Sequence, residues 1–266
     1  MNFIWKNGAL HSNDILISTN DRALRGDGVF DTMLCVDGQP VYIEEHLARL
    51  LESAEILSIA VPFDITALGN AVAETIEKNS SSQGRTCITI TITRGVGARG
   101  LATPNDAEPT VLIQMSPAPA PLPALHTIIA RSVRRNEGSP LSQMKTLNYG
   151  HNILARREAH NAGANEAILL NNVGHVTCFT VGNIFIVSDG QLLTPPLSDG
   201  VMDGIIRRKW IERADVVERS LSVDDLESAE AIFLTNSLRG IVPLASLNGK
   251  TLSVPDFPFD PDIHLG

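Results

Sequence analysis

A single lysine, Lys145, stands where its amine could do chemistry, because it comes just before a predicted helix. The segment 149–162 is rich in strong helix formers, contains no proline and is followed by Gly163, a residue typical of a helix C-terminus. A lysine beside a buried sheet loses its proton more readily, and a neutral amine can attack an aldehyde to form a Schiff base. Most lysines are exposed, so chemistry alone leaves a surface lysine as the commoner alternative.

The residues after this helix predict the sheet beside which Lys145 would lie. Short strands are expected at 166–170, 175–178 and 183–187, because turn signals at 171–174 and 189–190 bound these apolar runs. The connections are short enough for hairpins. We therefore expect a helix that leads into an antiparallel sheet.

Five motifs in this part of the chain occur in an order that resembles one enzyme family. They are Lys145-Thr-Leu-Asn-Tyr149, Ala164-Asn-Glu-Ala167, Gly174-His-Val-Thr177, Gly182-Asn-Ile-Phe185 and Thr194-Pro-Pro-Leu197. Together they resemble the class IV aminotransferases, the fold-type-IV pyridoxal-phosphate enzymes that include branched-chain and D-amino-acid transaminases and 4-amino-4-deoxychorismate lyase. The resemblance extends from Asn7 to Pro243. It implies a two-domain α+β (mixed α/β) fold, pyridoxal 5'-phosphate as cofactor and Lys145 as the Schiff-base residue.

Residues 3–43 are expected to form antiparallel hairpins around two Asx-Gly turns. The predicted strands are 4–6, 15–18, 28–36 and 40–43. Within 28–36, Phe30 and Thr32 alternate onto one face and Asp31 onto the other. The resemblance implies that this strand borders the substrate, with Phe30 and Thr32 in contact with it.

A helix is predicted at 44–59, with an apolar stripe and a neighbouring face that carries His46, Arg49 and Ser53. A planar guanidinium can bind a dianionic phosphate through two hydrogen bonds. A solvated arginine is the common alternative for a residue on a helix. The resemblance assigns Arg49, in its His-x-x-Arg-Leu pattern, to the cofactor phosphate.

A second amphipathic helix is predicted at 64–78, and a strand at 85–94 alternates threonine with apolar residues. In the loop that follows, the resemblance implies that Arg99 contributes a guanidinium for the substrate carboxylate. Leu101 stands where D-amino-acid transaminases have a histidine and the lyase has a tyrosine. The sequence therefore departs from both relatives at this position in the loop.

The only proline-rich stretch, 116–124, is semi-rigid and poor in backbone donors, so we place a linker there. The expected domains are a small α+β domain at 1–115 and a larger domain at 125–266 that carries Lys145.

A phosphate contact is also expected where 201–207 opens a helix after Gly204. A helix N-terminus presents free N–H groups, which bind phosphate. The family uses an Ile-Thr pair here. Ile205 matches it, whereas Ile206 lacks the threonine hydroxyl and would act through its backbone.

A predicted strand at 231–235 leads into further expected site residues. Counted back from Pro243, Ser237 stands where the family supplies a hydroxyl to the phosphate. The resemblance places Leu238 and Arg239 at the substrate. The sequence Thr235-Asn-Ser-Leu238 resembles the lyase more than the branched-chain transaminases.

The main departure from the family is Cys178, which follows the Gly-x-Val-Thr run where relatives have a glutamate. A carboxylate at this position keeps the cofactor ring nitrogen protonated, whereas a thiol is ordinarily uncharged at neutral pH. The cofactor would then withdraw electrons less strongly. Tyr149 is expected at the phenolic oxygen of the cofactor.

Composition narrows the remaining possibilities. The chain has 266 residues, 43% hydrophobic and 19% charged, which favours a globular protein over a disordered one. A net charge of −9 without a basic cluster disfavours a nucleic-acid partner. We expect a cytoplasmic protein, because neither a signal peptide nor a membrane span is evident. Three dispersed cysteines predict free thiols and no metal site.

The preferred hypothesis is that the protein is a 4-amino-4-deoxychorismate lyase, which makes 4-aminobenzoate and pyruvate in the folate pathway. Loss of enolpyruvate creates an aromatic ring, so this reaction needs a weaker electron sink than transamination does. A transaminase of D-amino acids or of branched-chain or other small amino acids is the first alternative. A cofactor-binding homodimer without efficient turnover is the second. In each case the resemblance implies a homodimer, and the two enzymes would act on a small-molecule amino substrate.

Overall fold

The computed structural model describes residues 3–12, 15–79, 84–104, 106–252 and 263. Their contacts divide them into two compact units. Unit 1 comprises the described residues up to Ala118 together with Lys145–Asn148, and unit 2 comprises those of Pro119–Met144 and from Tyr149 onwards. The lysine segment therefore packs within unit 1, although the chain on both sides of it belongs to unit 2. The linker at 116–124 stays a prediction. That prediction did not include the return of Lys145–Asn148 to unit 1.

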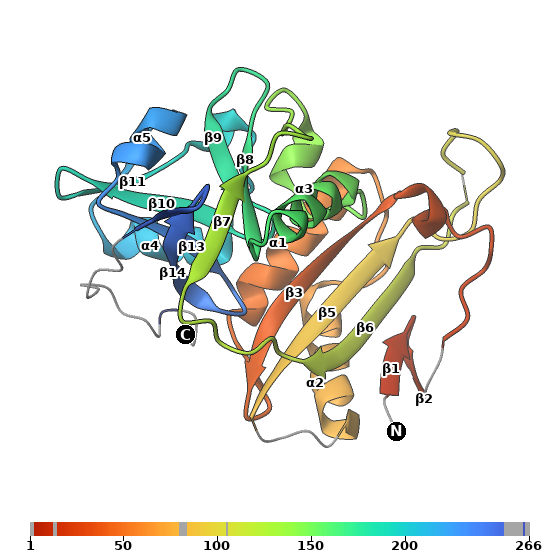
Figure 1. Ribbon diagram of the computed structural model, residues 1–266. Helices are drawn as coiled ribbons and strands as arrows, with labels where there is room; N and C mark the ends of the chain where they lie inside the picture. Colours follow the sequence, from red (N-terminus) through yellow and green to blue (C-terminus); the bar gives the residue numbers. More distant parts are fainter. Residues whose placement is uncertain (1–2, 13–14, 80–83, 105, 253–262, 264–266) are drawn as a thin grey trace. The chain divides into compact units, whose positions relative to one another are not determined.

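Unit 1 is built on a six-stranded sheet in the order β2-β1-β6-β5-β3-β4. Its described strands pair antiparallel, and Figure 1 shows β3, β5 and β6 side by side. The strands are β1 (Phe3–Lys6), β2 (Ala9–Ser12), β3 (Gly28–Val36), β4 (Gln39–Pro40), β5 (Arg85–Thr93) and β6 (Thr110–Pro117).

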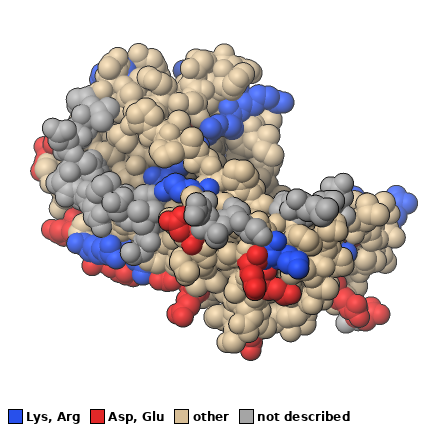
Figure 2. Space-filling view, turned by 90° about the horizontal axis from the view of Figure 1, so that it is seen from below, with Lys and Arg blue, Asp and Glu red and all other residues tan. Residues whose placement is uncertain are grey.

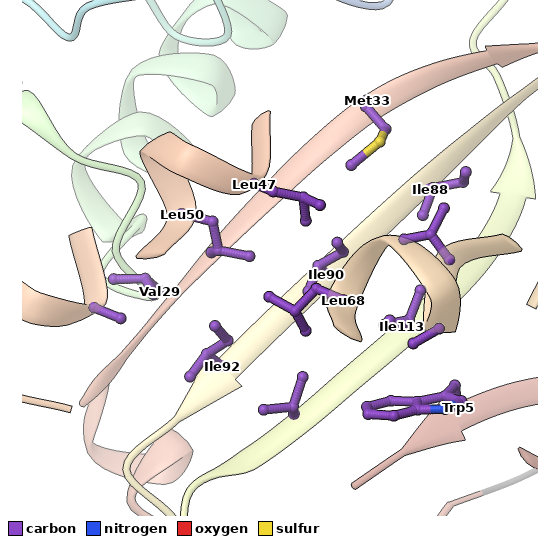
Figure 3. Packing of buried hydrophobic residues seen from close by; sticks show 14 of the residues in the cluster. Trp5, Val29, Met33, Leu47, Leu50, Leu68, Ile88, Ile90, Ile92 and Ile113 are labelled. Carbon is purple, nitrogen blue, oxygen red and sulfur yellow. The ribbon is translucent and has the colours of Figure 1, made fainter. Parts of the chain in front are cut away.

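Two helices, α1 (Ile43–Ile56) and α2 (Ile65–Asn79), cover one face of this sheet. The alternation in β5 sends its isoleucines to that face, where they are fully buried. Figure 3 shows Ile88, Ile90 and Ile92 packed with side chains from the helices and neighbouring strands. This core gives β3 and α1 a rigid common support.

Two of the predicted strands in the N-terminal part are wrong. Residues 15–18 form no strand, because β2 follows the Asn7-Gly8 turn directly and takes the pairing positions along β1. Leu16 is 88% exposed, so this apolar pattern is not buried in unit 1. The strand predicted at 40–43 ends at Pro40, and Ile43 already begins α1.

Unit 2 contains a nine-stranded mixed sheet in the order β12-β11-β10-β13-β14-β7-β8-β9, with β15 beside β14. A further pairing between β9 and β10 joins two separated members of this path. The strands are β7 (Leu125–Ile129), β8 (Glu166–Leu170), β9 (Val176–Phe179), β10 (Asn183–Ser188), β11 (Gln191–Thr194), β12 (Val216–Glu218), β13 (Ala231–Asn236), β14 (Gly240–Leu247) and β15 (Lys250–Thr251).

Three α-helices belong to unit 2: α3 (Gly150–Asn161), α4 (Ile205–Arg213) and α5 (Val223–Ser228). Short 3-10 helices lie at Arg22–Arg25 in unit 1 and at Pro140–Gln143 and Leu197–Asp199 in unit 2. The helix predicted after Lys145 is confirmed, because α3 begins directly after Tyr149.

Acidic and basic side chains lie next to one another on the face shown in Figure 2, with uncharged surface between them. Within the described part of the chain, no helix is both long and apolar enough to cross a membrane. Cys35, Cys87 and Cys178 are buried as free thiols.

Candidate functional site

Lys145 lies at the edge of β3 and extends the sheet of unit 1. The N–H of Phe30 donates to the carbonyl oxygen of Lys145 at 2.8 Å, and the N–H of Leu147 donates to that of Gly28 at 3.0 Å. This pairing sets Lys145 opposite Phe30, and the Lys145 amine stands 4.9 Å from the centre of the Phe30 ring. The sheet therefore positions the amine.

Two glycines make room for this docking. Gly26 has a positive φ of 71°, and its carbonyl oxygen accepts a 2.9 Å hydrogen bond from the Asn148 side chain. A Cβ on Gly26 would overlap that side chain, and one on Gly28 would come within 2.9 Å of Leu147. Position 26 therefore requires glycine, because the backbone is left-handed there and the Asn148 side chain leaves no room for a Cβ.

Asp31 lies on the opposite face of β3, where a set of donors from the backbone and from α1 surrounds its carboxylate. Its oxygens accept from the Thr32 N–H at 2.7 Å, from His46 Nδ1 at 2.9 Å, and from Arg49 Nε and Nη2 at 2.9 and 2.8 Å. Asp31 and His46 are each 1% exposed and Arg49 is 7% exposed. Arg49 is therefore a buried ion-pair partner and not a solvated helix charge.

These groups influence one another's ionisation. Burial alone would raise the pKa of Asp31, but Arg49, His46 and Lys145 together hold it well below its usual range. Burial lowers the pKa of His46, against the effect of Asp31. Desolvation likewise lowers the pKa of Lys145; Asp31 opposes this shift, and Arg49 adds to it. A lowered pKa makes the Lys145 amine a better nucleophile at neutral pH.

Sequence reasoning placed Phe30 and Thr32 on one face of β3 and Asp31 on the other, and this alternation is present. Thr32 faces β5, where its hydroxyl lies 3.2 Å from that of Thr89. The roles of Asp31 and His46 were missed. The available signal was a charged residue within an apolar strand, on the face toward which the next helix presents His46 and Arg49 three residues apart.

The loop after β5 is held by two ion pairs that share the half-buried Asp27 carboxylate. The Asp27 carboxylate accepts from Arg22 Nε at 2.6 Å and from Arg94 Nε at 2.9 Å. Arg22 also donates to the carbonyl oxygen of Gly100 at 3.1 Å. Arg99, which precedes Gly100, is exposed. The structure thus anchors the loop but brings Arg99 into no described contact with Lys145.

In unit 2 the expected phosphate contact falls at the first turn of α4. Gly204 is the N-cap residue, and no side chain caps the turn. A Cβ on Gly204 would overlap the Asn183 side chain, which donates to the Met202 carbonyl oxygen at 2.8 Å. The Ile205 and Ile206 side chains are buried, so only their backbone N–H groups are suited to bind phosphate.

Cys178 lies in β9, in the small apolar cluster that supports α3. The buried members of this cluster are Ala130, Val133, Ala155, Ala159, Ala167, Leu169 and Cys178. The thiol is 7% exposed, and the Thr177 hydroxyl lies 3.6 Å from its sulfur. This environment supplies little polarity beside the sulfur.

Glu166 of the neighbouring strand β8 is already paired. Its side chain is paired with Arg156 and Thr180, and it also accepts from the N–H of Ala167 at 2.8 Å. It is 1% exposed. Glu166 therefore serves a local network and offers no spare charge to a ligand.

Ser237, Leu238 and Arg239 form the partly buried turn between β13 and β14. The N–H groups of Leu238 and Arg239 donate to the Asn236 side chain at 3.1 and 2.8 Å. Burial and the nearby Arg156 lower the pKa of Arg239, an effect that Glu166 opposes. The predicted unit 2 residues thus lie at the start of α3, in β9, at the start of α4 and in this turn.

Comparison with known proteins gives a consistent family. The model of amino-transferase class IV matches residues 28–247. A Methanocaldococcus jannaschii protein, provisionally named a branched-chain-amino-acid aminotransferase, is 35% identical over 260 residues, covering 94% of this chain and 89% of its own.

Solved structures agree. The branched-chain aminotransferase of Thermoproteus uzoniensis has a TM-score of 0.90 at 27% identity and covers 99% of this chain and 92% of its own. The 4-amino-4-deoxychorismate lyase of Pseudomonas aeruginosa has a TM-score of 0.83 at 31% identity, covering 95% and 94%. With a lysine of lowered pKa on the β3 edge and a family match over most of its length, the chain belongs to the class IV aminotransferases, with their fold type IV architecture.

Proposed function

We propose that this pyridoxal-phosphate-dependent enzyme is a 4-amino-4-deoxychorismate lyase that releases pyruvate and forms 4-aminobenzoate. Relatives of this chain include both lyases and aminotransferases, so family membership leaves the reaction open. The observation that carries the proposal is Cys178, whose thiol lies among apolar side chains at the position where the resemblance expects a glutamate.

The described residues fit the cofactor. Its aldehyde needs an amine, and the lowered pKa of Lys145 favours the neutral form. Its phosphate needs oriented donors, and both the Arg49 guanidinium and the uncapped first turn of α4 are donors of this kind. When bound, pyridoxal phosphate supplies an electron sink for charge that develops at the substrate α-carbon.

The chain's own residues then have distinct roles in the proposal. Lys145 would hold the cofactor and afterwards move the substrate's α-proton as a general base. Tyr149 would donate to the phenolic oxygen of the cofactor. The cofactor phosphate would be held by Arg49, the Gly204–Ile206 backbone and Ser237.

Substrate contacts are assigned to a separate set of side chains: Phe30, Thr32, Arg99, Leu238 and Arg239. The guanidinium groups of Arg99 and Arg239 can bind carboxylates, whereas Phe30 and Leu238 supply apolar contact.

Cys178 bears on the choice of reaction. The thiol carries no carboxylate charge to hold a proton on the cofactor ring nitrogen, and Glu166 is occupied by Arg156 and Thr180. A weaker sink slows transamination, which depends on delocalised charge. It affects the lyase less, because formation of an aromatic ring drives that reaction.

A transaminase is the second candidate. The relative from Methanocaldococcus jannaschii and the structure from Thermoproteus uzoniensis are both named for branched-chain substrates and cover most of this chain. If this reading is correct, the enzyme exchanges amino groups despite Cys178.

Steady-state assays on the purified protein test these alternatives. The substrates are 4-amino-4-deoxychorismate, D-alanine with an oxo-acid acceptor, and L-leucine with the same acceptor. The proposal expects 4-aminobenzoate release at a kcat/KM at least about tenfold above either transamination. Faster transamination would replace the lyase assignment, and cofactor binding without any turnover would favour the non-catalytic homodimer.

We also propose a homodimer, which rests on the resemblance to the family. Light scattering of the full-length protein with bound cofactor should give a mass near twice the 28.6 kDa of one chain. A mass of one chain across the micromolar range would exclude it.

A further inference from the structure

The Asp31 carboxylate is surrounded more completely than a simple ion pair requires. A carboxylate has about four lone-pair sites, and four hydrogen-bond donors from Thr32, His46 and Arg49 lie within 2.9 Å of its oxygens. The group is 1% exposed, in the middle of β3 between the fully buried Val29 and Met33 on the same face. Burying a charge there is unfavourable unless it is fully paired.

We propose that Asp31 is a positioning residue of the active site: it fixes the plane of the Arg49 guanidinium and places a negative charge within electrostatic reach of the Lys145 amine. The inference rests on the proposed roles of Lys145 and Arg49 in cofactor binding. It adds a residue that contacts neither substrate nor cofactor in the scheme above.

Orientation of Arg49 follows from the hydrogen-bond geometry. Asp31 receives both Nε and Nη2, so the two groups form a two-point contact and the guanidinium cannot rotate about its own axis. Arg49 is also carried by α1, which is packed on the sheet through Leu47 and Leu50. A lysine at position 49 would keep the charge and lose this orientation.

His46 completes the arrangement as a neutral donor. An ionised carboxylate only accepts hydrogen bonds, so the proton of the imidazole lies on Nδ1, which contacts Asp31 at 2.9 Å. Burial lowers the pKa of His46 and keeps the ring uncharged at neutral pH. Its Nε2 is buried without a hydrogen-bond partner, so the ring adds a donor to Asp31 without adding charge.

Two charged groups of unit 1 act on the Lys145 amine, Asp31 from β3 and Arg49 from α1, whereas the neighbouring His46 is uncharged. Desolvation and Arg49 favour the neutral amine, whereas Asp31 favours the charged one. The effect of Asp31 is transmitted through protein, where charges are screened less than in water. Asp31 therefore limits how far the amine is neutralised.

The test measures Lys145 directly in the full-length protein stripped of cofactor. Trace acetic anhydride acetylates only neutral amines, and peptide mapping gives the acetylation rate of each lysine against pH. At pH 7, Lys145 should be acetylated at least about threefold faster in Asp31→Asn than in wild type. In Arg49→Gln its acetylation should be at least about threefold slower than in wild type. Asp106→Asn, at an exposed aspartate of the same unit, should leave the rate unchanged.

Opposite directions separate electrostatics from loosening of the fold. If Asp31 and Arg49 served only as structural partners, both variants would expose Lys145 and speed its acetylation. Equal rates in wild type and Asp31→Asn would also overturn the proposal. If Asp31→Asn does not fold, the double variant Asp31→Asn/Arg49→Gln replaces both partners and leaves no buried unpaired charge. It should then be acetylated faster than Arg49→Gln alone, and an equal or slower rate would overturn the proposal.

A holoenzyme measurement addresses orientation. Arg49→Lys keeps the charge of Arg49, so the acetylation rate of Lys145 should stay near wild type while cofactor affinity falls at least about tenfold. Unchanged cofactor affinity in Arg49→Lys would contradict the orienting role. Neither the acetylation rate nor the cofactor affinity depends on the substrate. Both can therefore be interpreted even if the lyase assay fails.

Discussion

The N–H of Phe30 donates a 2.8 Å hydrogen bond to the carbonyl oxygen of Lys145, and the Lys145 amine lies over the Phe30 ring. A lysine that follows a loop of unit 2 is therefore ordered by a strand of unit 1. Substitutions in β3 should therefore alter the environment of Lys145 although Lys145 itself is unchanged.

Gly26→Ala should disturb the lysine segment. At a φ of 71° an added Cβ strains the backbone by about 1 kcal/mol, and it also displaces the Asn148 side chain from the Gly26 carbonyl oxygen. We expect a loss of unfolding free energy of roughly 2 kcal/mol in urea titrations and slower covalent attachment of the cofactor.

Gly190→Ala provides the matched control. Gly190 has the same φ of 71°, but nothing lies within 4 Å of an added Cβ. Gly190→Ala should be destabilised only by the backbone strain, about 1 kcal/mol, and should attach cofactor at the wild-type rate. Equal attachment rates in the two variants would show that Asn148 does not hold the lysine segment.

Lys145 should be the site of covalent cofactor attachment. Borohydride reduction of the protein with bound cofactor, followed by peptide mapping, is expected to label the peptide that contains Lys145. Lys145→Ala should lose both this label and the visible absorbance of the attached cofactor. A label on another lysine, or none, would contradict the assignment.

Arg49→Ala should weaken cofactor binding by at least about tenfold, because a charged hydrogen bond contributes about 1.5–3 kcal/mol. It also leaves Asp31 buried without its cation, which destabilises the fold by about 3–5 kcal/mol. Both quantities are measurable, by fluorescence titration with pyridoxal phosphate and by urea unfolding.

Ser237→Ala should weaken cofactor binding less than Arg49→Ala, since it removes a neutral donor. Arg157→Ala removes an exposed arginine and should change neither quantity. A cofactor dissociation constant that is unchanged in Arg49→Ala would place the phosphate elsewhere.

Cys178→Glu should restore the charge that relatives place at the ring nitrogen, and should raise transamination more than lyase turnover. The ratio of the two activities is the informative quantity. Glutamate is larger than cysteine, and overpacking this alanine-rich cluster typically costs about 1–3 kcal/mol. Cys178→Gln has the same size without the charge, so it measures the steric part alone.

Cofactor occupancy is checked first in both Cys178 variants. If Cys178→Glu folds, binds cofactor and matches Cys178→Gln in activity and spectrum, the side chain does not face the ring nitrogen. The alignment of β9 with the family would then be wrong.

Acid should weaken the contribution of Asp31 to stability. Its pKa is lowered in the folded protein from an ordinary value of 3.8, so the contribution is complete above that value and declines as pH falls below it. Urea unfolding between pH 7 and pH 3 should therefore show a difference between wild type and Asp31→Asn that is constant down to about pH 5 and then shrinks. A difference that persists unchanged at pH 3 would contradict the lowered pKa.

Periodic patterns were sufficient for much of the fold. The isoleucine and threonine alternation predicted β5 to within one residue, and the helix formers after Lys145 predicted α3. Such patterns report burial of one face, and burial is local to an element. The segment 15–18 shows the limit, because the same apolar pattern is exposed where β2 already occupies the pairing positions.

Pairings between distant residues could not be predicted from spacing. Asp31 meets Arg49 because β3 and α1 pack together, and Lys145 meets Phe30 across more than a hundred residues. Neither pairing leaves a periodic signal in the sequence. The candidate residues came from the order of family motifs, and their partners required the structure.

The return of residues 145–148 to β3 has a consequence for the order of synthesis. β4 pairs with only Cys35 and Val36 at this edge of β3. The stretch from Gly28 to Phe30 pairs with the segment that begins at Lys145, and Lys145 is translated 115 residues after Phe30. At roughly 5–20 residues per second the edge stays open on the order of ten seconds. An unpaired strand edge invites association with other chains, so nascent unit 1 should be prone to aggregation until the ribosome has delivered the lysine segment.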